Sequence, residues 1–114
     1  MVVASLILGS LLVAACGSDT VSEGDGADST AASDDLLQIG AEVYAAMCAS
    51  CHGDEGQGGA GPGFEGVAER YPEVADHIEV VVSGIGLMPG FGGVLDDTEV
   101  EAVVAYERDV LDSG

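Results

Sequence analysis

The stretch Met47-Cys48-Ala49-Ser50-Cys51-His52-Gly53 decides how this chain folds. It contains a C-x-x-C-H string, in which two thiols lie three residues apart and an imidazole follows directly. On a helical turn, Cys48 and Cys51 can each add across a vinyl group of a haem, which leaves His52 beneath the iron as an axial ligand. The string therefore predicts one covalently attached haem c.

A bare C-x-x-C pair has other uses, as a redox dithiol or as half of a zinc site. A thioredoxin-like dithiol needs a preceding strand in a βαβ unit, and no such pattern precedes Cys48. A four-ligand zinc site needs a second pair of ligands. The only other cysteine is Cys16, which lies near the start of the chain. The haem interpretation is therefore favoured over both alternatives.

The length of 114 residues allows one small domain with short appendages. Small domains bury little surface and often need a covalent or metal staple, a role that an attached haem would fill. The chain has 21 acidic residues and only two basic ones, Arg70 and Arg108, which gives a formal net charge of −19. Such a surface would repel a phosphate backbone, so nucleic acid is excluded as a partner. The charge favours a protein partner with a basic patch, although solubility or a saline habitat would also explain it.

The first residues are interpreted as a leader. The apolar stretch Val2–Ala15 is shorter than the ~20 residues that cross a bilayer as a helix, and it ends in Leu12-Val13-Ala14-Ala15-Cys16. Small residues running into a cysteine resemble a bacterial lipoprotein signal box, so we expect residues 1–15 to be a signal peptide and Cys16 to be lipidated. The positive charge usual before such a stretch is missing, which is consistent with a true start upstream of Met1. An ordinary secretory leader or an uncleaved anchor are the alternatives.

Three segments follow from composition. Residues 16–34, rich in Gly, Ser, Asp and Ala, are expected to form a flexible acidic tether, and residues 35–114 the folded domain. Apolar residues at three- and four-residue spacing predict a first helix over residues 36–48. The glycine-rich residues 53–66 are expected to form a loop.

Two further helices are predicted. A middle helix is expected to begin near Pro72 and to stop at Gly84. Asp96, with Glu99 three residues on, predicts a capping box at the start of the last helix. On that last helix, Glu107 is expected to lie off the apolar stripe.

The residue that occupies the other side of the iron decides whether the haem only transfers electrons or can also bind an external ligand. Met88 lies in a loop framed by Gly and Pro, and its thioether is a soft ligand that raises the reduction potential. His77 is the rival, but its simpler interpretation is an exposed histidine near the start of the middle helix. Met47 lies on the same helix as Cys48 and cannot reach across the ring. We therefore predict His52 and Met88 as the two iron ligands.

From about Leu36 to Leu111 the sequence resembles a class I c-type cytochrome of the small bacterial kind. The resemblance rests on residues spread along the domain: Gly40 and Tyr44, Cys48-x-x-Cys51-His52-Gly53, Gly61-Pro62, Met88-Pro89, Phe91-Gly92, and Val103-x-x-Tyr106. It implies an all-α fold of three to four helices around the haem. It also implies that the first and last helices cross, so that Gly40 and Tyr44 meet Val103 and Tyr106. The carbonyl of Pro62 is expected on the imidazole of His52.

With His52 and Met88 both on the iron, no site is left vacant for a substrate, so we expect an electron carrier rather than an enzyme. We expect a monomer outside the cytoplasm, anchored to the membrane through Cys16. Its redox partners would be an oxidase, a quinol-oxidising complex or a dehydrogenase. The lysines with which many members surround the exposed haem edge are absent from this chain. The alternative is a haem-based sensor or a small catalytic haem protein whose sixth ligand is displaceable.

Overall fold

The structure is a computed structural model, and it describes residues 25–112. These residues form an all-helical domain whose elements follow one another as α1 (Asp25–Val43), the π-helical turn η1 (Tyr44–Cys48), α2 (Ala49–His52), α3 (Val67–Arg70), α4 (Val74–Ser83), α5 (Asp97–Tyr106) and the π-helical turn η2 (Glu107–Leu111). The only β-type pairing in this range is a single bridge between Ile85 and Met88. The predicted all-α class is confirmed.

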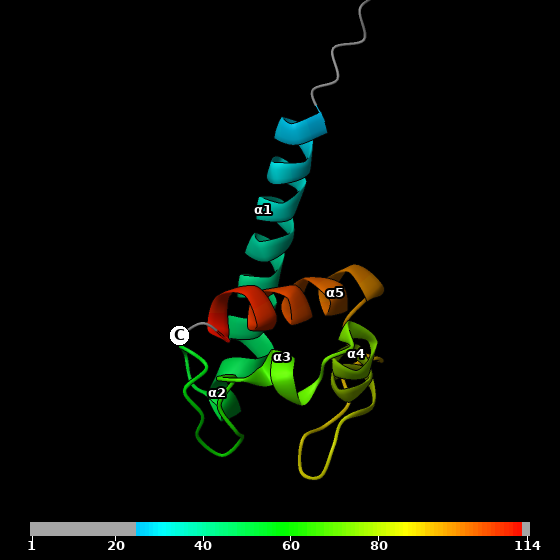
Figure 1. Cartoon of the computed structure of the whole chain (residues 1–114). Helices are drawn as coiled ribbons and strands as arrows, with labels where there is room; N and C mark the ends of the chain where they lie inside the picture. The colour runs from blue at the N-terminus through cyan, green and yellow to red at the C-terminus, as the bar shows by residue number, and fades with distance from the viewer. Residues whose placement is uncertain (1–24, 113–114) are drawn as a thin grey trace, which may run out of the picture.

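The first and last helices cross, as expected. In Figure 1, α5 lies across the lower part of α1, and this is the main helix contact of the domain. Gly40 makes the crossing possible, because a Cβ at this position would lie 2.8 Å from the Cβ of Tyr106. One turn later, the rings of Tyr44 and Tyr106 lie 5.6 Å apart. A residue without a side chain therefore sets how closely the two helices approach.

Helix α1 begins earlier than the sequence predicts. Residues 25–34 are helical, although their composition favours part of a flexible tether. Residues 30–35 are all exposed, so burial does not hold this segment in place. The segment contains three alanines, and alanine has the highest helix propensity. The helix that packs against α5 at Gly40 thus extends outward past the body of the domain (Figure 1).

The other predicted boundaries agree more closely with the structure. Helix α4 begins at Val74, because Glu73 is still extended (φ −86°, ψ 127°), and it ends at Gly84 as expected. The capping box at the start of α5 is complete. Asp96 accepts a hydrogen bond from the Glu99 amide at 2.9 Å, and Glu99 accepts one from the Asp96 amide at 3.0 Å.

The apolar core is built around the helix crossing. Its largest fully buried side chains are those of Tyr44, Val67, Val103 and Val104. The expectation that Glu107 lies off the stripe is wrong: Glu107 is buried, and Val110 is exposed instead. The π-helical turn η2 adds a residue to the helix here and so shifts the register of the side chains toward its end, Val110 among them.

The predicted signal peptide (residues 1–15) and the predicted lipid attachment at Cys16 lie outside the described residues, which begin at residue 25. Within the part of the chain that the structure describes, no helix is both long and apolar enough to cross a bilayer.

Candidate haem-binding site

The cysteines and the histidine of the motif lie on the wall of one cavity. The π-helical turn η1 ends at Cys48, and the single turn α2 carries Cys51 and His52. The cavity has a volume of about 660 Å³ and a mainly apolar lining, and Met88 lines the same cavity. All four residues predicted to hold the haem and its iron therefore face one space. That volume falls within the range usual for cofactor pockets.

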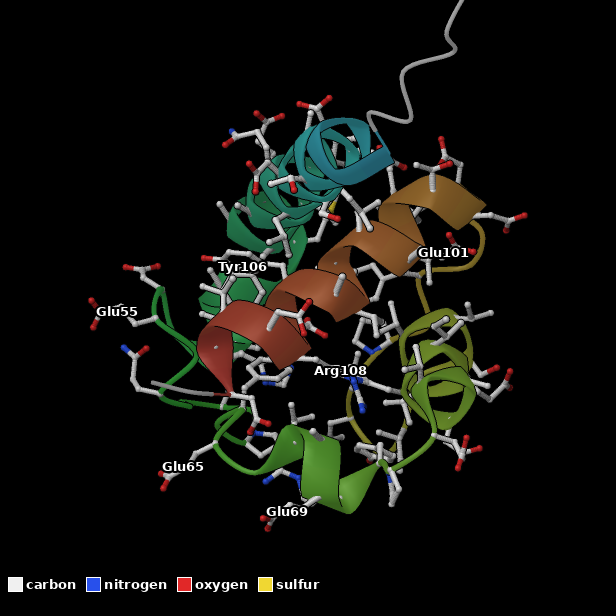
Figure 2. The ribbon with its side chains drawn as sticks, turned by 45° about the horizontal axis from the view of Figure 1, so that its top comes forward. Glu55, Glu65, Glu69, Glu101, Tyr106 and Arg108 are labelled. Atoms are coloured by element: carbon white, nitrogen blue, oxygen red, sulfur yellow. The ribbon has the colours of Figure 1, made fainter. Side chains whose placement is uncertain are left out.

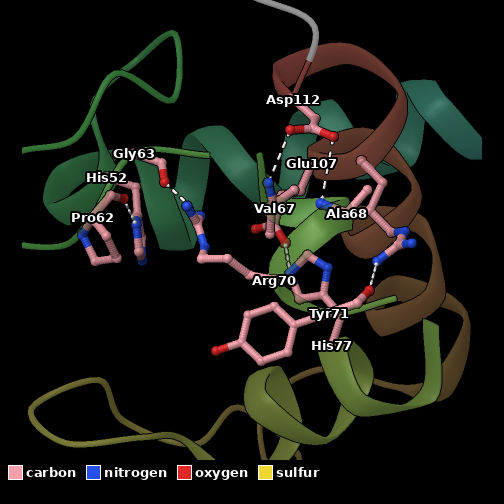
Figure 3. A network of polar contacts seen from close by, with 11 residues as sticks. His52, Pro62, Gly63, Val67, Ala68, Arg70, Tyr71, His77, Glu107 and Asp112 are labelled. Atoms are coloured by element: carbon pink, nitrogen blue, oxygen red, sulfur yellow. Dashed lines mark hydrogen bonds and ion pairs between the residues drawn. The ribbon is translucent and has the colours of Figure 1, made fainter. Parts of the chain in front are cut away.

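The imidazole of His52 is oriented by the glycine-rich loop. Its Nδ1 lies 2.7 Å from the carbonyl oxygen of Pro62, the contact that the family resemblance implied (Figure 3). A carbonyl oxygen can only accept a hydrogen bond, so Nδ1 carries the proton and Nε2 keeps its lone pair. An imidazole in this tautomer can bind a metal through Nε2, and its partner on Nδ1 fixes the ring.

Backbone lies directly against the imidazole of His52. A Cβ at Gly61 would be 2.8 Å from Cε1 of His52 and 3.0 Å from its Nδ1. The loop is held to α2 through hydrogen bonds from the Gly61 amide to the Cys51 carbonyl, at 2.8 Å, and from the Gly58 amide to the His52 carbonyl, at 2.6 Å. Only glycine fits at position 61 while the ring keeps its place.

The two thiols differ in environment. Cys48 is buried and Cys51 is exposed, and the two are not joined in a disulfide. Burial, followed by the negative charge of Glu107, raises the pKa of Cys48 to about 12. Redox-active and metal-binding cysteines need a low pKa, because the thiolate is the reactive form. The environment of Cys48 therefore does not suit the dithiol or zinc alternatives. No cluster of three or more metal-binding side chains exists among the residues described.

Met88 is presented by the irregular loop after α4. A pair of backbone hydrogen bonds joins it to Ile85, with the Met88 amide donating at 2.9 Å and the Ile85 amide at 3.2 Å. Gly84 (φ +77°) and Gly90 pack against the backbone at the two ends of this turn, where a side chain would collide. Met88 is half-buried and packs against the core. Its thioether is thus held at the cavity by a closed turn.

His77 lies where the sequence analysis did not place it. It is buried, not exposed, because it lies four residues before Val81 on the inward face of α4. Its ring lies flat against that of Tyr71, with centroids 5.5 Å apart, and its Nε2 lies 3.1 Å from Glu107 (Figure 3). Both His77 and Glu107 line the cavity.

Spacing alone could have placed Glu107 on the inward face. It follows Val104 by three residues and precedes Leu111 by four, which is the spacing of the buried stripe. The charge of Glu107 instead favours an exposed position, because carboxylates are rarely buried unless paired.

The only two basic side chains brace the loops around the cavity. Arg70 donates to the carbonyls of Gly63 at 2.8 Å and Glu65 at 2.9 Å. Arg108 lies in the π-helical turn η2 and donates to the carbonyl of Tyr71 at 2.7 Å; Figure 2 shows it pointing inward. Directly after η2, Asp112 accepts hydrogen bonds from the first amides of α3, the nearer at 2.9 Å (Figure 3).

The chain resembles known proteins over the same region. Residues 35–106 match the family described as cytochrome c oxidase, cbb3-type, subunit III. Cytochrome c-551 of Bacillus subtilis is 36% identical over 98 residues, which cover 85% of this chain and 83% of that protein. The FixP subunit of the cbb3-type oxidase of a Bradyrhizobium species is 32% identical over 72 residues, but these span only 25% of its length.

A solved structure shows the same fold. Cytochrome cL of Hyphomicrobium denitrificans superposes with a TM-score of 0.60 at 26% identity, over 67% of this chain and 48% of that one. The matched region includes the haem-attachment string, Gly40 at the helix crossing and Met88. The chain therefore belongs to the cbb3-type subunit III family of cytochrome domains, and it is a class I c-type cytochrome that carries electrons on one covalently bound haem c.

Proposed function

We propose that this chain is a single-electron carrier in which His52 and Met88 hold the haem iron from opposite sides. The observation that carries this proposal is their placement on one cavity, with Nδ1 of His52 bonded to Pro62 and Nε2 left available. When bound, the haem supplies a metal that cycles between two oxidation states. With both axial positions filled by side chains, no position on the iron remains for a substrate.

Each motif residue then has a distinct task. Cys48 and Cys51 would hold the macrocycle through thioether bonds to its two vinyl groups. Pro62 keeps the imidazole oriented and makes it a stronger ligand. Met88 favours the reduced state, because a thioether raises the reduction potential relative to a second imidazole.

An optical spectrum tests this ligand set. The oxidised, haem-loaded protein should show the weak sulfur-to-iron charge-transfer absorbance in the far red, and Met88→Ala should abolish it. Met47→Ala serves as the matched control, since Met47 lines the same cavity from the motif side and should leave the band intact. A band that survives in Met88→Ala would show that Met88 is not the ligand.

We further propose that the domain is anchored outside the cytoplasm through a lipid on Cys16. The sequence around Cys16 supports this, since small residues run into the cysteine at the end of a short apolar stretch. The test is Cys16→Ser: the wild-type chain should fractionate with membranes and the variant should not. Equal fractionation of the two would contradict lipid anchoring.

The partner is proposed to be a redox protein with a basic patch, such as an oxidase, a quinol-oxidising complex or a dehydrogenase. The net charge of −19 supports this, and Figure 2 shows Glu55, Glu65 and Glu69 projecting away from the ribbon. The similarity to an oxidase subunit is consistent with such a partner. Steering between opposite charges is screened by salt, so the rate of electron exchange should fall as ionic strength rises.

A further inference from the structure

One ionisable pair in the cavity wall has no part in haem attachment or iron ligation. His77 of α4 and Glu107 of η2 are each only 3% exposed, and His77 Nε2 lies 3.1 Å from Glu107 Oε2. Figure 3 shows the two side chains facing each other from different elements, beside Tyr71. Two ionisable groups thus share one buried position next to the cofactor space.

Within the described part of the chain, the pair has hydrogen-bonding capacity that no other side chain satisfies. Nδ1 of His77 and Oε2 of Glu107 have no hydrogen-bond partner of good geometry among the described residues. The guanidinium groups of Arg70 and Arg108 donate to backbone carbonyls instead. The net charge of the pair is therefore set by proton binding. A neutral imidazole beside a carboxylate carries −1 in total, and one additional proton on either group makes the pair neutral.

The side chains that contact the pair directly are weak acids or neutral, and the charged guanidinium of Arg108 lies beyond Tyr71, to whose carbonyl it donates. Tyr44 and Cys48 approach Glu107 from η1, and its charge contributes to the raised pKa of each of them, about 12 in both cases. Tyr71 stacks on the imidazole of His77, and the ring of Phe64 lies 6.5 Å away. The effect on Cys48 shows that the charge of Glu107 is felt at a thiol that attaches the haem. Once that thiol is a thioether it no longer titrates, and the pair is left as the main proton-binding group at this wall.

We propose that His77 and Glu107 form a redox-linked proton-binding site, which takes up one proton from water when the haem receives an electron and releases it on oxidation. The electron comes from the reduced redox partner and the proton from solvent, so the charge of the cavity is unchanged by the exchange. The driving force is Coulombic, because an added negative charge in a low-dielectric cavity favours an added positive one nearby. This inference rests on the electron-carrier function, but not on Met88 being the sixth ligand.

The coupling is reciprocal, which makes it measurable as a potential. If electron uptake favours proton binding, proton binding must raise the reduction potential by the same free energy. The midpoint potential of the haem-loaded full chain should therefore fall as pH rises. The limit for complete one-proton coupling is about 59 mV for each tenfold change in proton concentration.

Variants of His77 and Glu107 test whether this pair causes the dependence of the midpoint potential on pH. Glu107→Gln keeps the volume of the side chain but removes the titrating carboxylate, and His77→Gln removes the imidazole. Both should flatten the dependence of the potential on pH. The matched control is Glu101→Gln, an exposed carboxylate on the neighbouring helix, which should keep the wild-type slope. A slope that persists in both pair variants would assign the proton to another group and overturn the proposal.

A second measurement needs no variant. The chain has only two histidines, so ¹⁵N-histidine labelling reports on His52 and His77 alone. The ring nitrogen signals of His77 should titrate at higher pH in the reduced protein than in the oxidised one. Equal titration in both redox states, or a wild-type potential that does not vary with pH, would overturn the inference. A normal one-electron redox curve in the same experiment would leave the carrier function standing.

Discussion

At the scale of single residues, the imidazole of His52 is positioned by two neighbours in the glycine-rich loop. Gly61 lets the backbone approach the ring by lacking a side chain, and the carbonyl of Pro62 accepts a hydrogen bond from Nδ1. His52 could be identified from its motif, because the spacing of the C-x-x-C-H string leaves little freedom. The burial of His77 could not, since it depends on how α4 rotates against a helix thirty residues further along.

A methyl group at position 61 should displace the proximal imidazole. In Gly61→Ala the new Cβ would lie 2.8 Å from Cε1 of His52, so either the ring or the loop must move. We expect a weakened Pro62 hydrogen bond, an altered reduction potential and a loss of stability of about 1–3 kcal/mol, as for other overpacked sites. Potentiometry and thermal unfolding of the haem-loaded protein measure these effects.

Gly93→Ala is the control for this substitution. A Cβ at Gly93 meets nothing within 4 Å, so neither potential nor stability should change appreciably. Equal behaviour of the two alanine variants would show that close contact at position 61 does not orient His52.

Tyr44 should make stability depend on pH in the alkaline range. Its hydroxyl donates to the Gly53 carbonyl at 2.6 Å, and burial, aided by the charge of Glu107, raises its pKa from 10.0 to about 12. The folded state therefore holds this proton where the unfolded state has lost it, so the contribution is complete below pH 10 and is lost as pH rises towards 12. Urea unfolding of the haem-loaded protein at several pH values measures the decline.

Tyr44→Phe removes the titrating group and should make that decline shallower. In the haem-loaded protein Cys48 is a thioether and cannot contribute to it. An unchanged pH dependence in Tyr44→Phe would mean that the loss of stability comes from other groups.

At the scale of helices, glycine and capping positions predict the structure better than composition does. Asp96 and Glu99 form the capping box that their spacing indicates, and Gly84 ends α4. Composition failed at residues 25–34, because a polar, acidic segment can still be helical when it continues a helix that is packed further along. The π-helical turn η2 was also beyond prediction, since one inserted residue per turn leaves no periodic signal in five residues.

The crossing of α1 and α5 should be sensitive to one methyl group. In Gly40→Ala the added carbon would lie 2.8 Å from the Cβ of Tyr106 and closer still to the backbone of Ala102. The better helix propensity of alanine, worth about 1 kcal/mol, cannot compensate if the two helices are forced apart. We expect a net destabilisation of about 1–3 kcal/mol in denaturant unfolding. A stabilised Gly40→Ala variant would show that the helices do not meet at this glycine.

At the scale of the whole molecule, helices and loops together line a cofactor space. The polypeptide leaves a cavity of about 660 Å³, and the buried core residues Cys48, Phe64, Val67 and Val81 form part of its wall. The sequence alone indicated the cofactor, and it predicted the attachment residues and both iron ligands. It did not indicate the ionisable pair in the wall, because two residues thirty positions apart meet only once the helices have packed.

The central claim is that His52 and Met88 close both axial positions of the iron. Carbon monoxide titration of the reduced, haem-loaded protein at neutral pH tests it most directly, because carbon monoxide binds only where a position is open. We predict that the wild-type protein does not bind carbon monoxide and that Met88→Ala binds it readily. Ready binding by the wild-type protein would contradict the closed carrier site and would favour a haem sensor or a small catalytic haem protein instead.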